Sequence, residues 1–192
     1  SNISKKNFIK NINIAKKYIK NGDVFQVVPS QRFETKYTGS VLKLYQALRK
    51  TNPSPFMYYF NFPRFKIVGS SPEILVRLRN KKITIRPIAG TRPRGKTKKL
   101  DIKYAKDLLK DKKEIAEHLM LLDLGRNDVG RVAIKSSVKV TSEFEIEKYS
   151  HVMHIVSNVE GKISPEKTAF EALMAGFPAG TVSGAPKIRA MQ

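Results

Sequence analysis

The sequence predicts a single folded domain of the α+β class, and three observations support this prediction. Segments with the composition of β-strands follow one another in runs that few helical segments interrupt, without the regular alternation of a doubly wound parallel sheet. The chain has 192 residues, enough for one domain with a sizeable core. Its hydrophobic content of 41% and aromatic content of 9% are typical of folded proteins. We therefore expect residues 1–192 to belong to a single domain.

Two helices are predicted in the first half of the chain, at residues 4–21 and 40–50. Ser4 is a suitable N-cap for the first helix, and Gly22 is a suitable residue to end it. Apolar residues recur on one face of each helix at helical spacing. The predicted strands of this half are residues 25–33, 56–62, 65–69, 74–79 and 83–88, with a turn at Asn80 and Lys81 before the last of them.

The second half should contain a long helix over about residues 112–124 and two strands, at 138–146 and 152–159. Ser164 and Pro165 are suitable as the N-cap and first residue of a further helix, which we expect to run to about Ala175. A last helix is expected to start near Pro186.

The composition excludes several kinds of protein. The chain has no cysteine, so disulfides, thiolate metal sites and cysteine nucleophiles are excluded. The densest apolar run, residues 119–122, is far shorter than the roughly 20 residues of a membrane-spanning helix. The first ten residues lack the apolar core of a signal peptide. We expect a cytoplasmic protein without a membrane partner.

The charge is strongly positive, with 37 Lys and Arg against 16 Asp and Glu, a net charge of +21. One interpretation is a nucleic-acid partner. The other is a lysine-rich surface without a specific polyanion partner. The basic residues are spread along the whole chain, without the interleaved aromatics of an RNA-binding surface, so we expect no nucleic acid. A small acidic substrate would benefit from the same field.

The first unusual segment is residues 87–95, with the sequence PIAGTRPRG. Small residues at Ala89 and Gly90 would let a ligand approach the backbone, and Thr91 offers a hydroxyl group. Arg92 and Arg94 could pair with ligand carboxylates. Taken alone, the segment is better explained as a glycine- and proline-rich turn with solvated arginines.

The second segment is residues 114–123, with the sequence EIAEHLMLLD. On a helix, Glu114 and Glu117 lie on the same face. Two such carboxylates suit a hard cation such as Mg²⁺, which binds a few carboxylates together with water and substrate oxygens. An exposed acidic face is the alternative. His118 does not belong to a zinc signature, because no second histidine follows at the required spacing.

The third segment is residues 177–187, with the sequence FPAGTVSGAPK. This loop is rich in small residues and leads into the helix expected near Pro186. Free N–H groups at the start of a helix bind anions, including carboxylates. The loop is not a phosphate-binding P-loop, because the required Gly-Lys-Ser/Thr is missing. A plain connecting loop is the alternative.

Together and in this order, the three segments resemble the chorismate-binding enzyme family. The resemblance extends over essentially the whole chain and is strongest to the branch that makes anthranilate. Five further segments carry it, namely residues 25–30, 52–57, 69–73, 123–128 and 149–154.

The resemblance implies part of a single chorismate-binding catalytic domain with two packed β-sheets and outer helices. It implies Mg²⁺ as cofactor, held by Glu117 with Glu114 close by, and chorismate as substrate. The residues that it implies for substrate binding are Gly90, Thr91, Thr181, Gly184 and Ala185. Glu73 matches the carboxylate that protonates the leaving hydroxyl group, and His154 matches a histidine that assists elimination.

Two positions refine the implied activity. Gln26 stands where water-adding relatives have a lysine base, and a glutamine cannot deprotonate water. Ala89 stands where many aminodeoxychorismate synthases have a lysine that attacks the substrate, and alanine removes that covalent route. Both favour the addition of ammonia and the release of anthranilate and pyruvate, with aminodeoxychorismate synthesis as the alternative.

The resemblance also implies a partner protein and an inhibitor site. Ammonia would come from a glutamine amidotransferase. Pro55, Phe56 and Met57 match the segment that contacts the feedback inhibitor tryptophan; a simple turn entering a strand is the alternative. The family carries further sequence on both sides, including an arginine and a second Mg²⁺ glutamate. We therefore expect this chain alone to be inactive.

Overall fold

The computed structural model describes all residues from Ser1 to Gln192, and they form two compact units. The first unit contains Ser1–Phe33 and Leu75–Gln192, and the second contains Glu34–Ile74. Helices and antiparallel strands occur in both units, so the α+β class is confirmed. The strands form one five-stranded and two two-stranded sheets. That all residues belong to a single catalytic domain stays a prediction.

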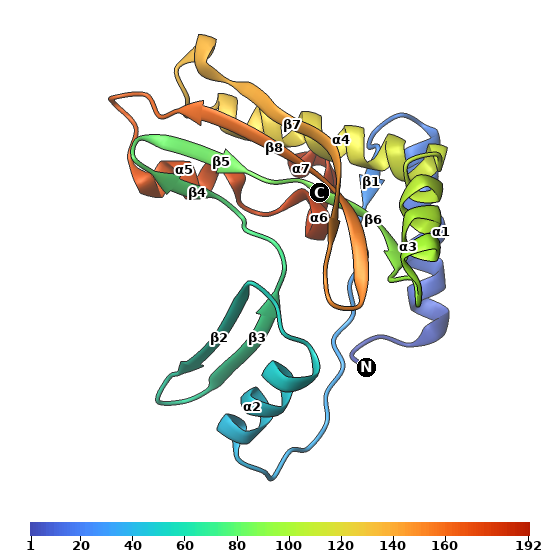
Figure 1. Cartoon of the computed structure of the whole chain (residues 1–192). Helices are drawn as coiled ribbons and strands as arrows, with labels where there is room; N and C mark the ends of the chain where they lie inside the picture. The colour runs from blue at the N-terminus through green and yellow to red at the C-terminus, as the bar shows by residue number, and fades with distance from the viewer. The chain divides into compact units, whose positions relative to one another are not determined.

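The five-stranded sheet of the first unit is built around β8 (Val152–Lys162), the central strand in Figure 1. Strand β7 (Lys139–Lys148) pairs with one edge of β8. Strands β5 (Lys82–Ile85) and β6 (Ile88–Pro93) follow one another along its other edge, and β4 (Arg77–Arg79) pairs with β5. Every pairing in this sheet is antiparallel.

The path of β5 and β6 corrects the predicted strand at 83–88. The strand stops at Ile85, because the next two residues include Pro87, which has no N–H to donate. The Pro87 carbonyl oxygen still accepts a hydrogen bond of 3.1 Å from the Ser157 amide, so the chain stays on the same edge of β8. It then pairs again as β6, so the segment for which a turn was the alternative interpretation is a strand.

Three helices lie against the sheet. They are α3 (Lys98–Leu108), α4 (Lys112–Gly130) and α5 (Ala169–Gly176). Apolar side chains of α4 and α5 pack with those of β5 and β8 to form the main core; its buried members include Ile83, Leu122, Val129, Val159 and Ala172. A smaller core joins Leu108 of α3 to Met153 and Ile155 of β8. None of the helices is long and apolar enough to cross a membrane.

Local sequence signals located several elements correctly. The helix predicted at 4–21 is α1 (Lys5–Lys20), and the Ser4 hydroxyl caps it by accepting from the Asn7 amide. Asn80 and Lys81 both have positive φ and form the tight turn between β4 and β5. The helix expected near Pro186 is α7 (Lys187–Met191).

Three other expectations were wrong in extent. Of the strand at 25–33, only β1 (Gln26–Val27) forms, paired with β9 (Gly184–Ala185). The helix expected from Ser164 begins at Ala169, because Thr168 and Glu171 form a reciprocal capping box there. The helix at 112–124 continues to Gly130, and α3 had not been predicted. Two short helices complete the unit, η1 (Lys135–Ser137) and α6 (Gly180–Ser183).

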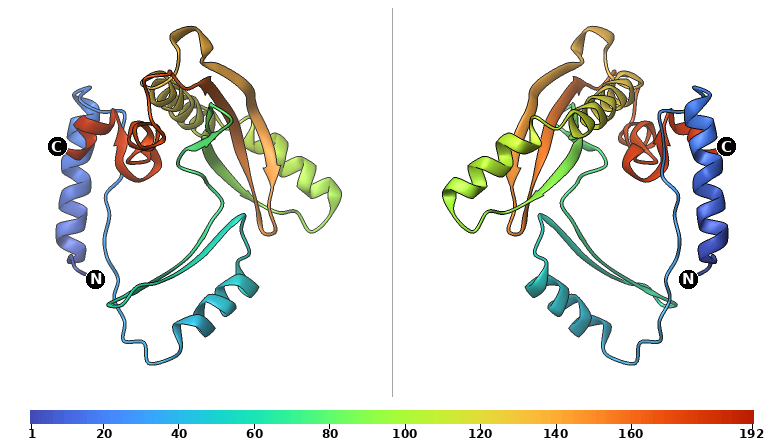
Figure 2. Two further views of the ribbon diagram at one scale, coloured as in Figure 1. Left: turned by 90° about the vertical axis from the view of Figure 1, so that its left-hand side faces the viewer. Right: turned by 90° about the vertical axis from the view of Figure 1, so that its right-hand side faces the viewer.

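The helices near the two ends of the chain, α1 and α7, lie side by side (Figure 2). Arg189 of α7 forms an ion pair of 2.6 Å with Asp23, and its guanidinium lies over the ring of Tyr18. These contacts hold the carboxyl end of the chain against α1.

The second unit is small and agrees with prediction. It contains α2 (Val41–Thr51), followed by an antiparallel hairpin of β2 (Phe56–Asn61) and β3 (Lys66–Ser71). These elements match the helix and two strands predicted from the sequence to within a few residues.

Candidate active site

Strand β6 contains a β-bulge at Gly90 and Thr91. The pairing register with β8 shifts between Ala89 and Arg92, and Gly90 has a φ of 69°, which favours glycine. This bulge explains why a segment with the glycine and proline content of a turn lies within a sheet. Ala89 itself is buried and pairs with Ile155.

His154 of β8 lies beside the bulge. Its Nδ1 is 2.8 Å from the Gly90 carbonyl oxygen and 3.1 Å from the Thr91 hydroxyl oxygen. A carbonyl can only accept, so the hydrogen bond to Gly90 requires the proton on Nδ1. The neutral ring then has its lone pair on Nε2. The bulge therefore sets the orientation of the ring and its tautomer.

The beginning of α4 also lies close to the bulge. A Cβ atom built on Gly90 would lie 3.2 Å from the Glu114 Oε2 and 3.0 Å from a methyl group of Leu108. Thus Gly90, Thr91, His154 and Glu114, four of the predicted site residues, come together at the meeting of β6, β8 and α4.

Arg92 and Arg94 pair with the protein's own carboxylates rather than being left for a ligand. Arg92 donates to Asp107 and Asp111 at 2.8 Å each, and it lies 3.7 Å from Glu114. Since Asp111 is the N-cap of α4, Arg92 fastens the start of that helix to β6. Arg94 binds Asp101 at 2.9 Å, which holds the pKa of that carboxyl well below its usual range.

The two glutamates fit a metal site only in part. Glu117 is half-buried and has no hydrogen bond or ion pair, so its carboxylate is open to a ligand. Glu114 is one helical turn away and is held loosely by Arg92. No group of three or more acidic or histidine side chains is arranged to hold a metal ion. Two carboxylates nonetheless suit Mg²⁺, which keeps water and substrate oxygens as its other ligands.

A second group of predicted residues meets at the pairing of β1 with β9. Gln26 pairs with Ala185, and Val27 pairs with Gly184. Gly184 has a φ of 128°, and a side chain there would collide with the Gln26 backbone. The Gln26 Oε1 is buried without a hydrogen-bond partner. Two segments distant in the sequence are therefore brought into contact by short β-pairing.

A hollow of about 600 Å³ connects this second group to α4. Ala185 lines it from β9, and Ala116 lines it from α4, between the two glutamates in sequence. Thr181 lies in α6, whose first residue, Gly180, packs directly on Leu124 of α4. Helix α4 thus borders both groups of predicted site residues.

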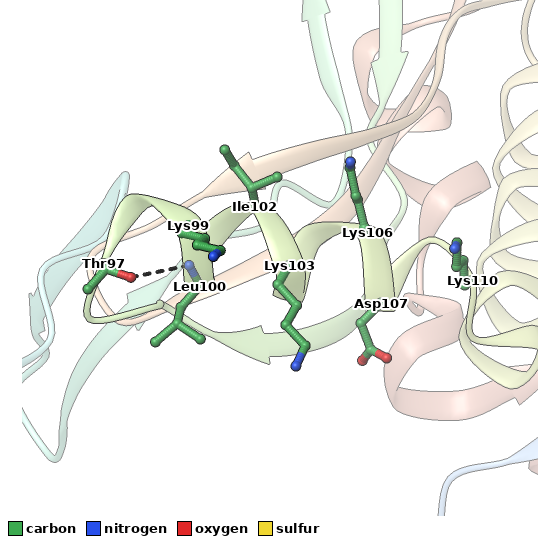
Figure 3. Close-up of a pocket in the computed structure, with 8 residues that line it drawn as sticks. All are labelled: Thr97, Lys99, Leu100, Ile102, Lys103, Lys106, Asp107 and Lys110. Atoms are coloured by element: carbon green, nitrogen blue, oxygen red, sulfur yellow. Dashed lines mark hydrogen bonds between the residues drawn. The ribbon is translucent and has the colours of Figure 1, made fainter.

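The lysine-lined hollow along α3 contains none of the predicted site residues (Figure 3). Its charged side chains are Lys99, Lys103, Lys106, Asp107 and Lys110. Lys99, Lys103 and Lys106 belong to α3, and Lys110 follows its end, so positive charge is concentrated along this hollow. The expected absence of a nucleic-acid partner stays a prediction.

Four predicted residues lie in the second unit. Pro55 precedes β2, and Phe56 and Met57 are its first two residues. Glu73 follows β3, where its backbone N–H donates to the Ser71 hydroxyl. Their roles in acid catalysis and in tryptophan binding stay predictions.

Sequence reasoning missed two buried polar pairs. His118 is fully buried, with its Nε2 2.6 Å from the Ser157 hydroxyl, and burial lowers its pKa to about 4. Lys187 donates to Asp128 at 2.6 Å, and both side chains are almost wholly buried. Burial raises the pKa of Asp128, and the bond from Lys187 opposes that rise. The only sequence signal was that Asp128 and Lys187 lie in or beside segments that carry the family resemblance.

The family model for chorismate binding enzymes matches residues 1–192, which is the whole chain. The chain belongs to this family. The resemblance predicted from the sequence is therefore confirmed.

Two relatives illustrate how similar the chain is to one branch of the family. Anthranilate synthase component 1 of Cereibacter sphaeroides is 60% identical over 192 residues, which are 100% of this chain and 38% of that protein. The protein of the same name from Synechocystis is 57% identical over 197 residues, covering 100% of this chain and 39% of its own length. The chain thus spans about two fifths of the length of these relatives.

Solved structures agree with this assignment. The crystal structure of anthranilate synthase component I from Streptococcus pneumoniae superposes with a TM-score of 0.90 at 48% identity, covering 98% of this chain and 41% of that one. An isochorismate synthase from Bacillus anthracis superposes with a TM-score of 0.73 at 22% identity, covering 95% of this chain and 50% of that one. This second likeness concerns the fold alone.

Proposed function

We propose that the chain forms part of the active site of an anthranilate synthase, a lyase that converts chorismate and ammonia to anthranilate, pyruvate and water. The observation that carries this proposal is the position of the Gly90–Thr91 bulge, between Glu114 of α4 and His154 of β8. The sequence identity of 60% with an anthranilate synthase component over the whole chain supports the choice of reaction.

Each residue of the site has a proposed task. The backbone of Gly90 and the hydroxyl of Thr91 bind and orient the substrate, because the bulge exposes polar backbone without a side chain. Glu114 and Glu117 would hold Mg²⁺, which when bound would neutralise a carboxylate of the substrate. The Thr181–Ala185 segment approaches a second carboxylate. Chorismate carries two carboxylates, so the site needs both contacts.

Proton transfers fall to two side chains. With Nδ1 committed to Gly90, the His154 Nε2 can accept a proton as the ring loses pyruvate and becomes aromatic. Glu73 is proposed to protonate the hydroxyl group that leaves as ammonia adds. Gln26 cannot act as a base and Ala89 offers no amine, so neither water activation nor covalent attack arises from these positions.

Several features of the proposed enzyme follow from the same assignment. Ammonia would be delivered by a glutamine amidotransferase partner. The enzyme would serve tryptophan biosynthesis in the cytoplasm, with feedback inhibition by tryptophan at Pro55, Phe56 and Met57.

A full-length chimera provides the test. Residues 1–192 would replace the matching segment of the Cereibacter sphaeroides protein, to which they are 60% identical. With chorismate, ammonium and Mg²⁺, we expect fluorescent anthranilate and an equal amount of pyruvate. Formation of aminodeoxychorismate or isochorismate without pyruvate would refute the proposed reaction. The unaltered Cereibacter protein is the control for the host sequence, and the isolated 192-residue chain should show no turnover.

A further inference from the structure

The buried ion pair between Asp128 and Lys187 joins two segments of the candidate site, helix α4 and the segment that contains Thr181 to Ala185. The Lys187 Nζ donates to the Asp128 Oδ2 at 2.6 Å and to the Gly176 carbonyl oxygen at 2.8 Å. The exposed fractions of the two charged side chains are 4% and 6%. One ammonium group therefore connects α4, the carboxyl end of α5 and the first residue of α7.

Stability alone does not account for such a pair. Removing two charges from water is costly, and apolar side chains of similar volume are often equally or more stabilising. The pair is also incompletely satisfied, since the Asp128 Oδ1 is buried without a hydrogen-bond partner. An ion pair differs from apolar packing in being directional. Its hydrogen bonds determine which groups face each other.

The segment that Lys187 holds is the one proposed to contact a substrate carboxylate. It is attached to α4 at both ends. At its beginning, Gly180 packs on Leu124, and at its end, Lys187 bonds to Asp128, one helical turn further along α4. Between these two points lie Thr181, Gly184 and Ala185.

The same helix carries the two glutamates. Positions 117, 121, 124 and 128 lie on one face of α4, because they are three or four residues apart. At 1.5 Å per residue, Glu117 and Asp128 are separated by roughly 16 Å along the helix axis. A rigid helix therefore sets the distance between the acidic pair and the point where the loop is fastened.

We propose that Asp128 and Lys187 are positioning residues, whose buried ion pair fixes the Thr181–Ala185 loop at a set distance from the acidic pair of α4. The link to substrate binding rests on the proposed function, whereas the fastening of the loop does not. Neither residue touches the reacting atoms in this account.

Hydrogen exchange in the isolated chain tests the fastening without any assumption about function. The variant pair Asp128→Leu with Lys187→Met removes both charges and leaves none unpaired. We expect amide exchange at residues 181–185 to become faster by about tenfold or more, while exchange in the core strand β8 is unchanged. The matched control is Arg189→Met, which removes an exposed ion pair from the same helix and should leave residues 181–185 unchanged.

The same substitutions in the full-length chimera test the consequence for the substrate. We expect the KM for chorismate to rise by about tenfold or more while the melting temperature stays near that of the unsubstituted chimera. If the Leu and Met pair does not fold, the near-isosteric pair Asp128→Asn with Lys187→Met replaces it in both measurements, with the same expected results.

The outcomes separate the two proposals. Unchanged exchange at residues 181–185 would overturn the fastening, whatever the chimera does. Faster exchange with unchanged KM would overturn the positioning of the substrate loop. If the unsubstituted chimera makes no anthranilate, the proposed function fails, and the exchange measurement still decides whether the pair holds the loop.

Discussion

Replacing Gly90 by alanine should damage the candidate site in a measurable and specific way. At a φ of 69°, an alanine costs about 1–2 kcal/mol relative to glycine. The new Cβ would also lie 3.0 Å from the Leu108 Cδ1 and 3.2 Å from the Glu114 Oε2, so both groups must move. Crowding of this kind costs about 1–3 kcal/mol. The expected total loss of unfolding free energy is therefore about 2–5 kcal/mol.

Gly22 offers a matched control. Its φ is 80°, but a Cβ there would have nothing within 4 Å. Gly22→Ala should therefore cost only the backbone contribution, about 1–2 kcal/mol. Urea unfolding followed by circular dichroism gives both losses, and Mg²⁺-dependent binding of chorismate to the chimera should weaken for Gly90→Ala alone. Equal losses of stability and intact binding in both variants would show that Gly90 is not pressed against Glu114.

Three further predictions concern stability. Thr168→Ala removes the capping box of α5 and should lower the unfolding free energy by about 1 kcal/mol in urea titrations; an unchanged midpoint would contradict this. Arg92→Met leaves carboxylates of α3 and α4 facing each other and should lower the unfolding free energy by about 1–3 kcal/mol. The loss should be smaller at high salt, because salt screens the repulsion between the carboxylates. A loss that does not depend on salt would argue against the charge network. Burial lowers the pKa of His118 from 6.5 to about 4. As the pH falls below 6.5, the unfolded chain binds a proton at this histidine while the folded chain does not, so the free energy of unfolding decreases until the pH reaches about 4. The loss should reach about 2 kcal/mol at pH 5 in metal-free buffer and be absent in His118→Gln, measured by urea unfolding at both pH values.

Local chemistry was sufficient to locate some elements from the sequence. The Ser4 cap of α1 and the turn at Asn80 and Lys81 depend on residues close together in the chain, and both were predicted. Strand β6 was not, because the residues with which it pairs lie 59 to 68 positions further along the chain, on β8, and this pairing makes the glycine-containing segment a bulged strand. Helix α3 was missed because its lysines obscure the helical periodicity of its apolar residues, one of which is the buried Leu108.

The residues of the candidate site were likewise predicted only in part. The family resemblance singled out Gly90, Thr91, His154 and Glu114, and the structure places them together. It did not reveal that Arg92 binds Asp111 at the start of α4, because this contact depends on β6 and α4 being adjacent in the fold. Lysine is rarely buried, so nothing in the local sequence indicated that Lys187 would be almost wholly enclosed.

The central claim is that the acidic pair of α4 and the Gly90–Thr91 bulge form one site for a divalent ion and chorismate. Calorimetric titration of chorismate into the chimera, with and without Mg²⁺ and in the absence of ammonia, tests it most directly. We predict that Mg²⁺ strengthens binding by about tenfold or more and that Glu117→Gln abolishes this gain. The same gain from Mg²⁺ in the unsubstituted and substituted proteins would contradict the account.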